Sequence, residues 1–331
     1  ALAAAPPGQG AGRMTALDTV IALGNGQTGL TRDELSTEVA ALAARLQVSR
    51  QPVMTALGAG VHTGDAGAGC STVGSTGVHM RAVASNKVHL NAERTGYVIC
   101  LPVPDLVTQV QTNMAATLNL DWALALAADL IGEGGETPSH ADLVARIDGW
   151  MARSTAGALL YHPYISEAGE RGPFVNAQAR ASLIGLTHHH RFADVIRAVI
   201  EGIALAARDC YAAMGEMPRE LRLTGGAARS RAVRQVLAST LNIPLRVSSR
   251  EEAGAAGCAM MAAVAIGAYP DMEACIADWT TPLLGESEPP DPALVPIYNA
   301  AFSQYRHARA ALALVWDDMA QAPKIAQGND R

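Results

Sequence analysis

The feature that most constrains this chain is an alternation of strand and helix patterns between residues 220 and 266. ELRLT (220–224) predicts a short strand, SRAVRQVLASTLN (230–242) predicts a helix with one apolar side, and IPLRVSS (243–249) predicts a second strand. A further helix is expected over 252–266, rich in Ala and Gly and suited to close packing. This order of elements predicts an α/β domain.

The first strand runs into the turn LTGGAARS (223–230), which has almost no side chains. Glycines between a strand and a helix let backbone N–H groups approach a ligand closely, and the helix N-terminus favours a phosphate. A tight connection without a ligand is the alternative interpretation. The turn is not GxGxxG, and no acidic residue ends the next strand, so a mononucleotide is favoured over a dinucleotide.

A second turn of small residues, GSTG (74–77), also follows a strand-like run and adds two hydroxyl groups. Hydroxyl and exposed N–H groups together suit phosphate oxygens, although a simple hairpin turn between GCSTV and VHMRAV is an equal alternative. Two such turns in one chain strengthen the phosphate hypothesis.

Elsewhere the sequence predicts a mixture of strands and helices. Strands are expected near 69–73, 78–83 and 97–103, and helices over 31–46, 114–131, 141–154 and around Val195–Ile203. The loop at 161–186 is long and aromatic, so it is expected to pack on the body of the domain.

Composition excludes several classes of protein. The chain has 331 residues, 49% of them hydrophobic, a net charge of −6 and no block of Lys or Arg, so binding to nucleic acid is not expected. No run is long enough for a membrane span, and the start of the chain lacks the pattern of a signal peptide. The five cysteines are widely spread and predict reduced core residues in a cytoplasmic protein, with no zinc site.

Several motifs together resemble the FGGY family of carbohydrate kinases. GSTG (74–77), NMAATLNLDW (113–122), GERGPFVNAQARASLIGL (169–186), LTGGAARS (223–230) and EEAGAAGCAMMAA (251–263) stand in the order and at the spacing of the C-terminal lobe of that family. Within the family, the run from GSTG to NLDW is most similar to the erythritol kinase branch.

The resemblance implies the actin-like ATPase (ribonuclease H-like) fold, an α/β lobe with a mixed sheet flanked by helices. It also implies binding of ATP with Mg²⁺ and transfer of the γ-phosphoryl group to a hydroxyl of a sugar or polyol. Carried over by motif, Gly74, Ser75 and Thr76 would contact the β- and γ-phosphates, and Gly225, Gly226 and Ala227 would lie against the α-phosphate and ribose. The other residues expected in the nucleotide site are Gly77, Thr117, Asp121 and Ser230.

Two parts of the family pattern are not found in this sequence. Residues 1–50 do not match the early Gly-rich, Asp-containing turn of the N-terminal lobe, and SRQPVM (49–54), just before TALGAG, lacks the Asp that the family uses as a base. Asp65 is the nearest candidate for a base, but a turn role is favoured. We therefore expect residues 1–52 to be a remnant or linker and 53–331 to form the nucleotide-binding lobe of an incomplete sequence.

Three further features have ordinary structural explanations. HHH (188–190) is expected in a surface loop, because consecutive imidazoles point in different directions. Arg171 could shape a cleft or brace its loop with an ion pair, and Glu201 is expected to be a buried, hydrogen-bonded structural carboxylate.

The function expected from the sequence is that of an ATP-dependent carbohydrate kinase, acting on a sugar or polyol that the sequence does not identify. The activity of this chain by itself stays open. One alternative is a non-catalytic nucleotide-binding or interaction protein, and another is an NAD(P)-dependent oxidoreductase that uses residues 223–230 as its phosphate turn. A homodimer is compatible with each of these, since the sequence does not set the oligomeric state.

Overall fold

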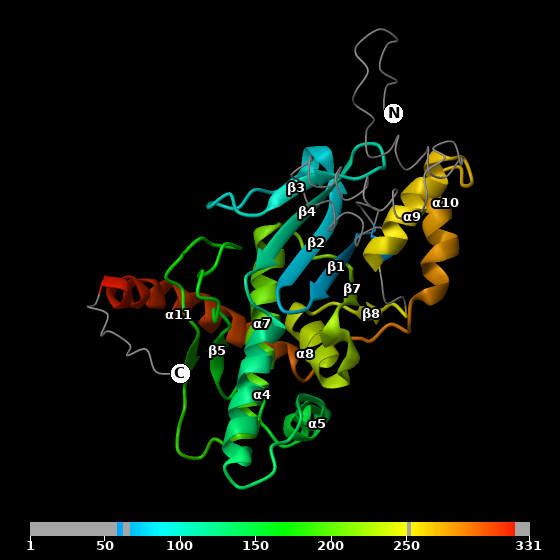
Figure 1. Ribbon diagram of the computed structural model, residues 1–331. Coiled ribbons are helices and arrows are strands. Elements are labelled where there is room, and N and C mark those ends of the chain that lie inside the picture. The colour runs from blue at the N-terminus through cyan, green and yellow to red at the C-terminus, as the bar shows by residue number, and fades with distance from the viewer. Residues whose placement is uncertain (1–57, 62–66, 250–252, 322–331) are drawn as a thin grey trace, which may run out of the picture.

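The computed structural model describes residues 58–61, 67–249 and 253–321, and its centre is a six-stranded mixed sheet (Figure 1). The strand order is β3-β4-β2-β1-β7-β8, with β1 parallel to β7, β7 parallel to β8 and the other neighbours antiparallel. The strands are β1 (Ala68–Val73), β2 (Gly77–Ala84), β3 (Tyr97–Cys100), β4 (Leu106–Asn113), β7 (Glu220–Thr224) and β8 (Leu245–Val247).

Helices cover both faces of this sheet. On one face α7 (Phe192–Ala213) and α8 (Arg231–Leu241) pack on Leu221 and Leu223 of β7, and α4 (Thr117–Gly132), α5 (His140–Ala145) and α6 (Ile147–Ala152) join the same apolar core. On the other face α9 (Ala253–Ala265) and α10 (Met272–Trp279) pack on Cys70 and Met80. Because successive residues of a strand point to opposite faces, β1 contributes to both cores.

A smaller layer lies beside the main sheet. The two-stranded sheet of β5 (Leu160–His162) and β6 (Ser182–Ile184) and the long helix α11 (Val295–Gln321) pack against α7. Their shared core includes Tyr164, Phe174 and Tyr305, and the Tyr164 and Tyr305 hydroxyls are hydrogen-bonded at 2.6 Å.

Local signals explain where several helices begin and end. The Ser230 side chain accepts a hydrogen bond from the Val233 N–H at the start of α8, and Asn242 ends that helix in the left-handed conformation at φ 54. Asp271 caps α10 in the same way, by accepting a hydrogen bond from the Ala274 N–H at 2.8 Å.

Most of the predicted elements are confirmed. The strands near 69–73 and 78–83, the helices at 230–242, 252–266 and around Val195, and the strands flanking α8 all lie within a few residues of their expected bounds. The loop at 161–186 packs on the body as expected, since Tyr164, Phe174 and Ala179 are buried, and it includes β6. The mixed sheet flanked by helices is the fold class that the sequence predicts.

Other predictions need correction. The expected helix 141–154 is two short helices that meet at Arg146, and the strand expected over 97–103 ends at Cys100. β4, α10 and α11 were not predicted. Cys100 and Cys258 are exposed rather than in the core, because β3 is an edge strand and Cys258 lies on the outer side of α9.

The helix expected at 31–46 and the candidate Asp65 lie outside the described residues. The proposed boundary between 52 and 53 therefore stays a prediction. Within the described ranges, no helix is both long and apolar enough to cross a membrane.

Glu201 has the structural role that the sequence predicts. It lies in α7 with 3% of its surface exposed, and its carboxylate accepts hydrogen bonds from the Tyr298 hydroxyl at 2.9 Å and from the Gly157 N–H at 3.1 Å. Arg197, one turn earlier, pairs with it at 3.2 Å. This carboxylate joins α7 to α11.

Close packing of α7 on β5 can be tested with one pair of glycines. A Cβ at Gly202 would lie 2.5 Å from the Tyr161 carbonyl oxygen, whereas a Cβ at Gly149 in α6 would meet open space. We expect Gly202→Ala to lower the free energy of unfolding by about 1–3 kcal/mol through overpacking. Gly149→Ala should leave it unchanged or raise it by up to about 1 kcal/mol through helix propensity. Urea unfolding measures both, and equal stabilities of the two variants would contradict this packing.

Candidate functional site

The two Gly-rich turns leave the same edge of the sheet. Strands β1 and β7 are parallel neighbours in which Thr72 is opposite Thr224, and the two Thr Oγ1 atoms are 2.9 Å apart. β1 then leads into the turn Gly74–Gly77 and β7 into the turn Gly225–Ser230. Turns at the carboxyl ends of adjacent parallel strands form a common ligand-binding position in α/β folds.

The turn Gly74–Gly77 connects β1 to β2, so the hairpin interpretation is confirmed, and it lies at the N-terminus of α4. The Ala116 N–H donates to the Ser75 carbonyl at 2.7 Å, and the Thr117 N–H donates to the Gly74 carbonyl at 2.8 Å. Ser75 and Thr76 are exposed at this position. The positive end of the α4 dipole and two hydroxyl side chains therefore lie together, an arrangement suited to an anion.

The turn after β7 requires glycine at its first position. Gly225 has φ 89, and a Cβ added there would be 2.7 Å from the Val73 carbonyl oxygen. Gly226 is exposed, and a Cβ there would meet open space. The Ala227 side chain is 8% exposed and packs in the core. Only its backbone is left to face a ligand.

The remaining predicted residues lie in α4 or at the start of α8. Thr117 is the first residue of α4 and lies at the edge itself. Asp121, one helical turn further on, has its carboxylate 3.1 Å from His140 Nε2. Ser230 caps α8 and donates to Asp148 Oδ1 at 3.2 Å, so its hydroxyl is engaged in structural contacts.

A buried polar network below the first turn was missed by sequence reasoning. Ser71 Oγ is 2.9 Å from His79 Nδ1 and 3.0 Å from the Tyr211 hydroxyl, and His79 Nε2 is 3.0 Å from Asn113 Oδ1. Burial lowers the pKa of His79 to about 4, so the imidazole is neutral near pH 7. A Cβ at Gly77 would be 3.0 Å from His79 Nε2, which places the end of the turn directly on this network.

The GERGP motif carries a second missed residue, Glu170. Arg171, the residue singled out from the sequence, is exposed, whereas Glu170 is only 1% exposed. Burial raises the pKa of Glu170 to about 7, against the backbone N–H groups of Arg171, Met114 and Gly172, which lower it. Acidic residues next to arginine are common on surfaces, so nothing in the local sequence marks this one as buried.

The described residues contain no group of three or more His, Cys, Asp or Glu side chains placed to hold a metal ion. The three histidines at 188–190 lie in the loop before α7, as predicted, and His188 and His189 are exposed.

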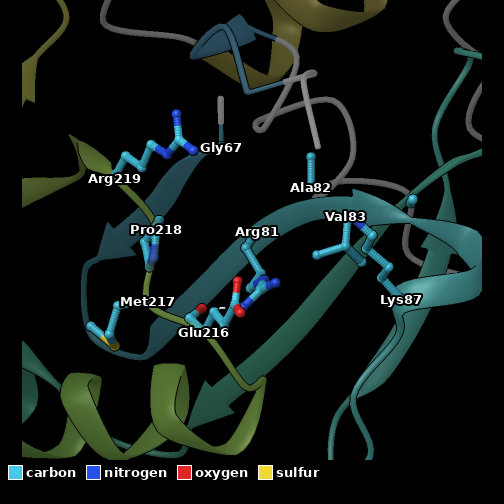
Figure 2. A pocket seen from close by; sticks show the side chains of 10 residues that line it. Gly67, Arg81, Ala82, Val83, Lys87, Glu216, Met217, Pro218 and Arg219 are labelled. Atoms are coloured by element: carbon cyan, nitrogen blue, oxygen red, sulfur yellow. Dashed lines mark hydrogen bonds between the residues drawn. The ribbon is translucent and has the colours of Figure 1, made fainter. Parts of the chain in front are cut away.

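A pocket of about 390 Å³ lies at the opposite edge of the sheet (Figure 2). It is lined by residues that precede β1 and β7, by the second half of β2 and by Lys87, which follows β2; the charged residues in this lining are Arg81, Lys87, Glu216 and Arg219. Arg81 Nη1 donates to the backbone oxygen of Glu216. Because this pocket is at the amino ends of β1 and β7, it is not part of the edge that carries the two turns.

The raised pKa of Glu170 has a measurable consequence for stability. The folded chain binds the Glu170 proton more tightly than the unfolded chain, so this residue favours folding below about pH 4.5, and the contribution is lost as the pH rises to about 7. Relative to Glu170→Gln, which does not ionise, the wild type should lose about 1 kcal/mol of unfolding free energy per pH unit in this window. Urea unfolding from pH 4.5 to 8 measures the difference, and parallel pH profiles of the two proteins would contradict it.

Comparison with known proteins gives one consistent result. Residues 69–266 match the C-terminal domain of the FGGY family of carbohydrate kinases. An erythritol kinase of Brucella abortus (strain 2308) is 64% identical over 267 residues, which cover 81% of this chain and 51% of that protein. A xylulose kinase of Escherichia coli (strain K12) is 32% identical over 210 residues, covering 62% of this chain and 40% of that protein.

Solved structures agree with these sequence matches. The crystal structure of a xylulose kinase from Rhodospirillum rubrum superposes with a TM-score of 0.66 at 26% identity, over 80% of this chain and 51% of that one. The chain thus spans about half the length of the erythritol kinase and of the R. rubrum xylulose kinase, and 40% of the E. coli xylulose kinase. With its strand order, its two turns at one sheet edge and a family match over more than half its length, this chain belongs to the FGGY family of carbohydrate kinases.

Proposed function

We propose that this chain is the nucleotide-binding lobe of an ATP-dependent kinase that phosphorylates a hydroxyl of a polyol. The observation that carries the proposal is the meeting of Gly74–Gly77, Gly225–Gly226 and the α4 N-terminus at one edge of the sheet. Membership of a carbohydrate kinase family supports ATP as the ligand of this edge. The same match argues against the oxidoreductase alternative.

In this proposal the two turns contact different parts of the nucleotide. Ser75 and Thr76 donate their hydroxyl groups to the β- and γ-phosphates, and the dipole of α4 adds positive potential next to them. Gly225 and Gly226 let the α-phosphate and ribose approach the backbone, because no side chain intervenes. Thr117 lies beside the first turn, Asp121 lies one helical turn further along α4, and Ser230 ends the second turn.

Magnesium fits this chemistry as a partner of the phosphate oxygens. A divalent cation bound with the nucleotide would supply positive charge that offsets the negative charge developing during phosphoryl transfer. Asp65 stays a prediction, both as a base and as a turn residue, since it lies outside the described residues.

The relatives point to the class of acceptor. The protein that is 64% identical is an erythritol kinase, whereas the E. coli xylulose kinase is only 32% identical. We therefore propose a short linear polyol, with erythritol as the first candidate, and we place the activity in the cytoplasm, where ATP is supplied. A homodimer and the division at residue 52 remain predictions.

A second candidate function is nucleotide binding without phosphoryl transfer. It is favoured by SRQPVM (49–54), which contains no Asp before TALGAG. A base assists the acceptor hydroxyl in phosphoryl transfer, so a chain without one would bind ATP and turn it over poorly.

Calorimetric titration with ADP and ATP, with and without Mg²⁺, tests nucleotide binding directly. We expect binding that strengthens with Mg²⁺ for ATP. A coupled assay for ADP release with erythritol, xylulose and glycerol then separates the two functions, because turnover favoured by erythritol supports the kinase and binding without turnover supports the second candidate. Binding of NADH in place of adenine nucleotides would contradict both.

The position of the nucleotide can be tested at Gly226. A Cβ there has open space in the protein alone, so Gly226→Ala should change the unfolding free energy by less than about 0.5 kcal/mol. The same Cβ would occupy the volume proposed for the nucleotide, and we expect the Kd for ADP to rise by about tenfold or more.

Gly149→Ala is the matched control for this experiment, since a Cβ at Gly149 also meets open space but lies on α6, away from the edge. It should leave the Kd unchanged. An unchanged Kd in Gly226→Ala would show that the nucleotide does not contact this turn.

A further inference from the structure

Glu170 is a buried acidic residue that has no role in the proposed function. It lies in the connection between β5 and β6, and its backbone pairs with Asn176 in both directions, at 2.9 and 3.0 Å. This pairing fixes the backbone from which the carboxylate projects. Only 1% of the residue is exposed, so ionisation in this position is costly without compensating contacts.

The carboxylate contacts backbone N–H groups of two separate segments. Glu170 Oε1 accepts from the Arg171 N–H at 2.9 Å and from the Met114 N–H at 3.0 Å. Met114 lies between β4 and α4, 56 residues away in sequence. An oxygen that accepts N–H groups from both segments holds the two segments together in either protonation state, and these hydrogen bonds are stronger when the group is ionised.

The segment that Glu170 contacts is the one that carries the first turn. Two residues after Met114, the Ala116 N–H donates to the Ser75 carbonyl at 2.7 Å, and the Thr117 N–H donates to the Gly74 carbonyl at 2.8 Å. Glu170 is therefore connected to the turn through its hydrogen bond to Met114, the backbone of residues 114–116, and the hydrogen bond from Ala116 to Ser75.

Asn113 provides a second connection between the same loop and the same turn. Asn113 Nδ2 donates to the Gly172 carbonyl at 3.2 Å, and Asn113 Oδ1 is 3.0 Å from His79 Nε2, on which Gly77 packs. The loop lies hard against β4 here, because a Cβ at Gly172 would be 2.6 Å from the Thr112 carbonyl oxygen.

Burial and the backbone N–H groups are the causes that act on the pKa of Glu170. Burial and, to a smaller extent, the Glu170 charge raise the pKa of its neighbours Tyr164 and Cys210, so both side chains are neutral near pH 7. The nearby Asp209 is paired with Arg309 and with Arg306 of α11.

We infer that Glu170 is a positioning residue for the candidate nucleotide edge: its buried carboxylate fixes the β4–α4 junction, and through Ala116 and Thr117 it fixes the Gly74–Gly77 turn. It does not itself touch the ligand. The inference rests on the proposed function for its effect on nucleotide affinity, but its effect on the turn is independent of any ligand.

The test compares two buried glutamates in the purified full chain. Glu170→Ala removes the acceptor beside the junction, Glu170→Gln keeps a carbonyl oxygen that accepts the Met114 N–H, and Glu201→Ala removes a carboxylate that is equally buried but joins α7 to α11. Amide hydrogen exchange is measured without ligand at 74–77 and 114–117. The Kd for ADP is measured at a temperature where all variants are folded.

We expect Glu170→Ala to speed exchange in both segments by about tenfold and to raise the Kd for ADP by about tenfold, with Glu170→Gln restoring most of both. Glu201→Ala should change neither. Unchanged exchange in Glu170→Ala, the same changes in Glu201→Ala, or faster exchange with an unchanged Kd would each overturn the inference. If the wild type binds no adenine nucleotide, the proposed function fails, and the exchange data alone decide whether Glu170 positions the turn.

Discussion

The parallel pairing of β1 with β7 is the constraint on which the rest of this structure depends. Thr72 is opposite Thr224, 152 residues away in sequence, so the two turns leave adjacent strands at the same edge. A shift of the register by one residue would reverse the faces of Leu221 and Leu223 and expose them, so the apolar core specifies the pairing strongly. The geometry of the candidate site is thus a consequence of core packing.

The first turn is fixed from below by polar contacts rather than by apolar ones. Ser71, His79, Asn113 and Tyr211 form a buried hydrogen-bonded network between β1, β2, β4 and α7. In a low-dielectric interior such a network is strongly directional, because each unpaired group would carry a desolvation cost. A turn with few side chains of its own therefore obtains a defined conformation from the residues beneath it.

The parts of the fold that sequence predicts are those with strong local patterns. Helix α8 has a serine cap and one apolar side, and β7 and β8 are short apolar runs next to turn residues. Strand β4 has no such pattern, because it buries the polar residues Gln109 and Gln111, whose side chains donate to carbonyl groups of neighbouring loops. Those partners are not neighbours in sequence. For α11 the sequence does contain the pattern of a helix, since the buried residues Tyr298, Ala301 and Tyr305 follow the helical period.

The sequence by itself determined the α/β class, the two Gly-rich turns and the family, since these depend on residue types at short spacings. Only the tertiary structure decided that Ala227 points into the core, that Ser230 is engaged in capping α8, and that Glu170 rather than Arg171 is the buried residue of its motif. The physical reason is that burial and hydrogen-bond partners come from segments distant in the chain. Gly225 illustrates both contributions. The sequence identifies the glycine, but the Val73 carbonyl that leaves no space for a Cβ at this position comes from another strand.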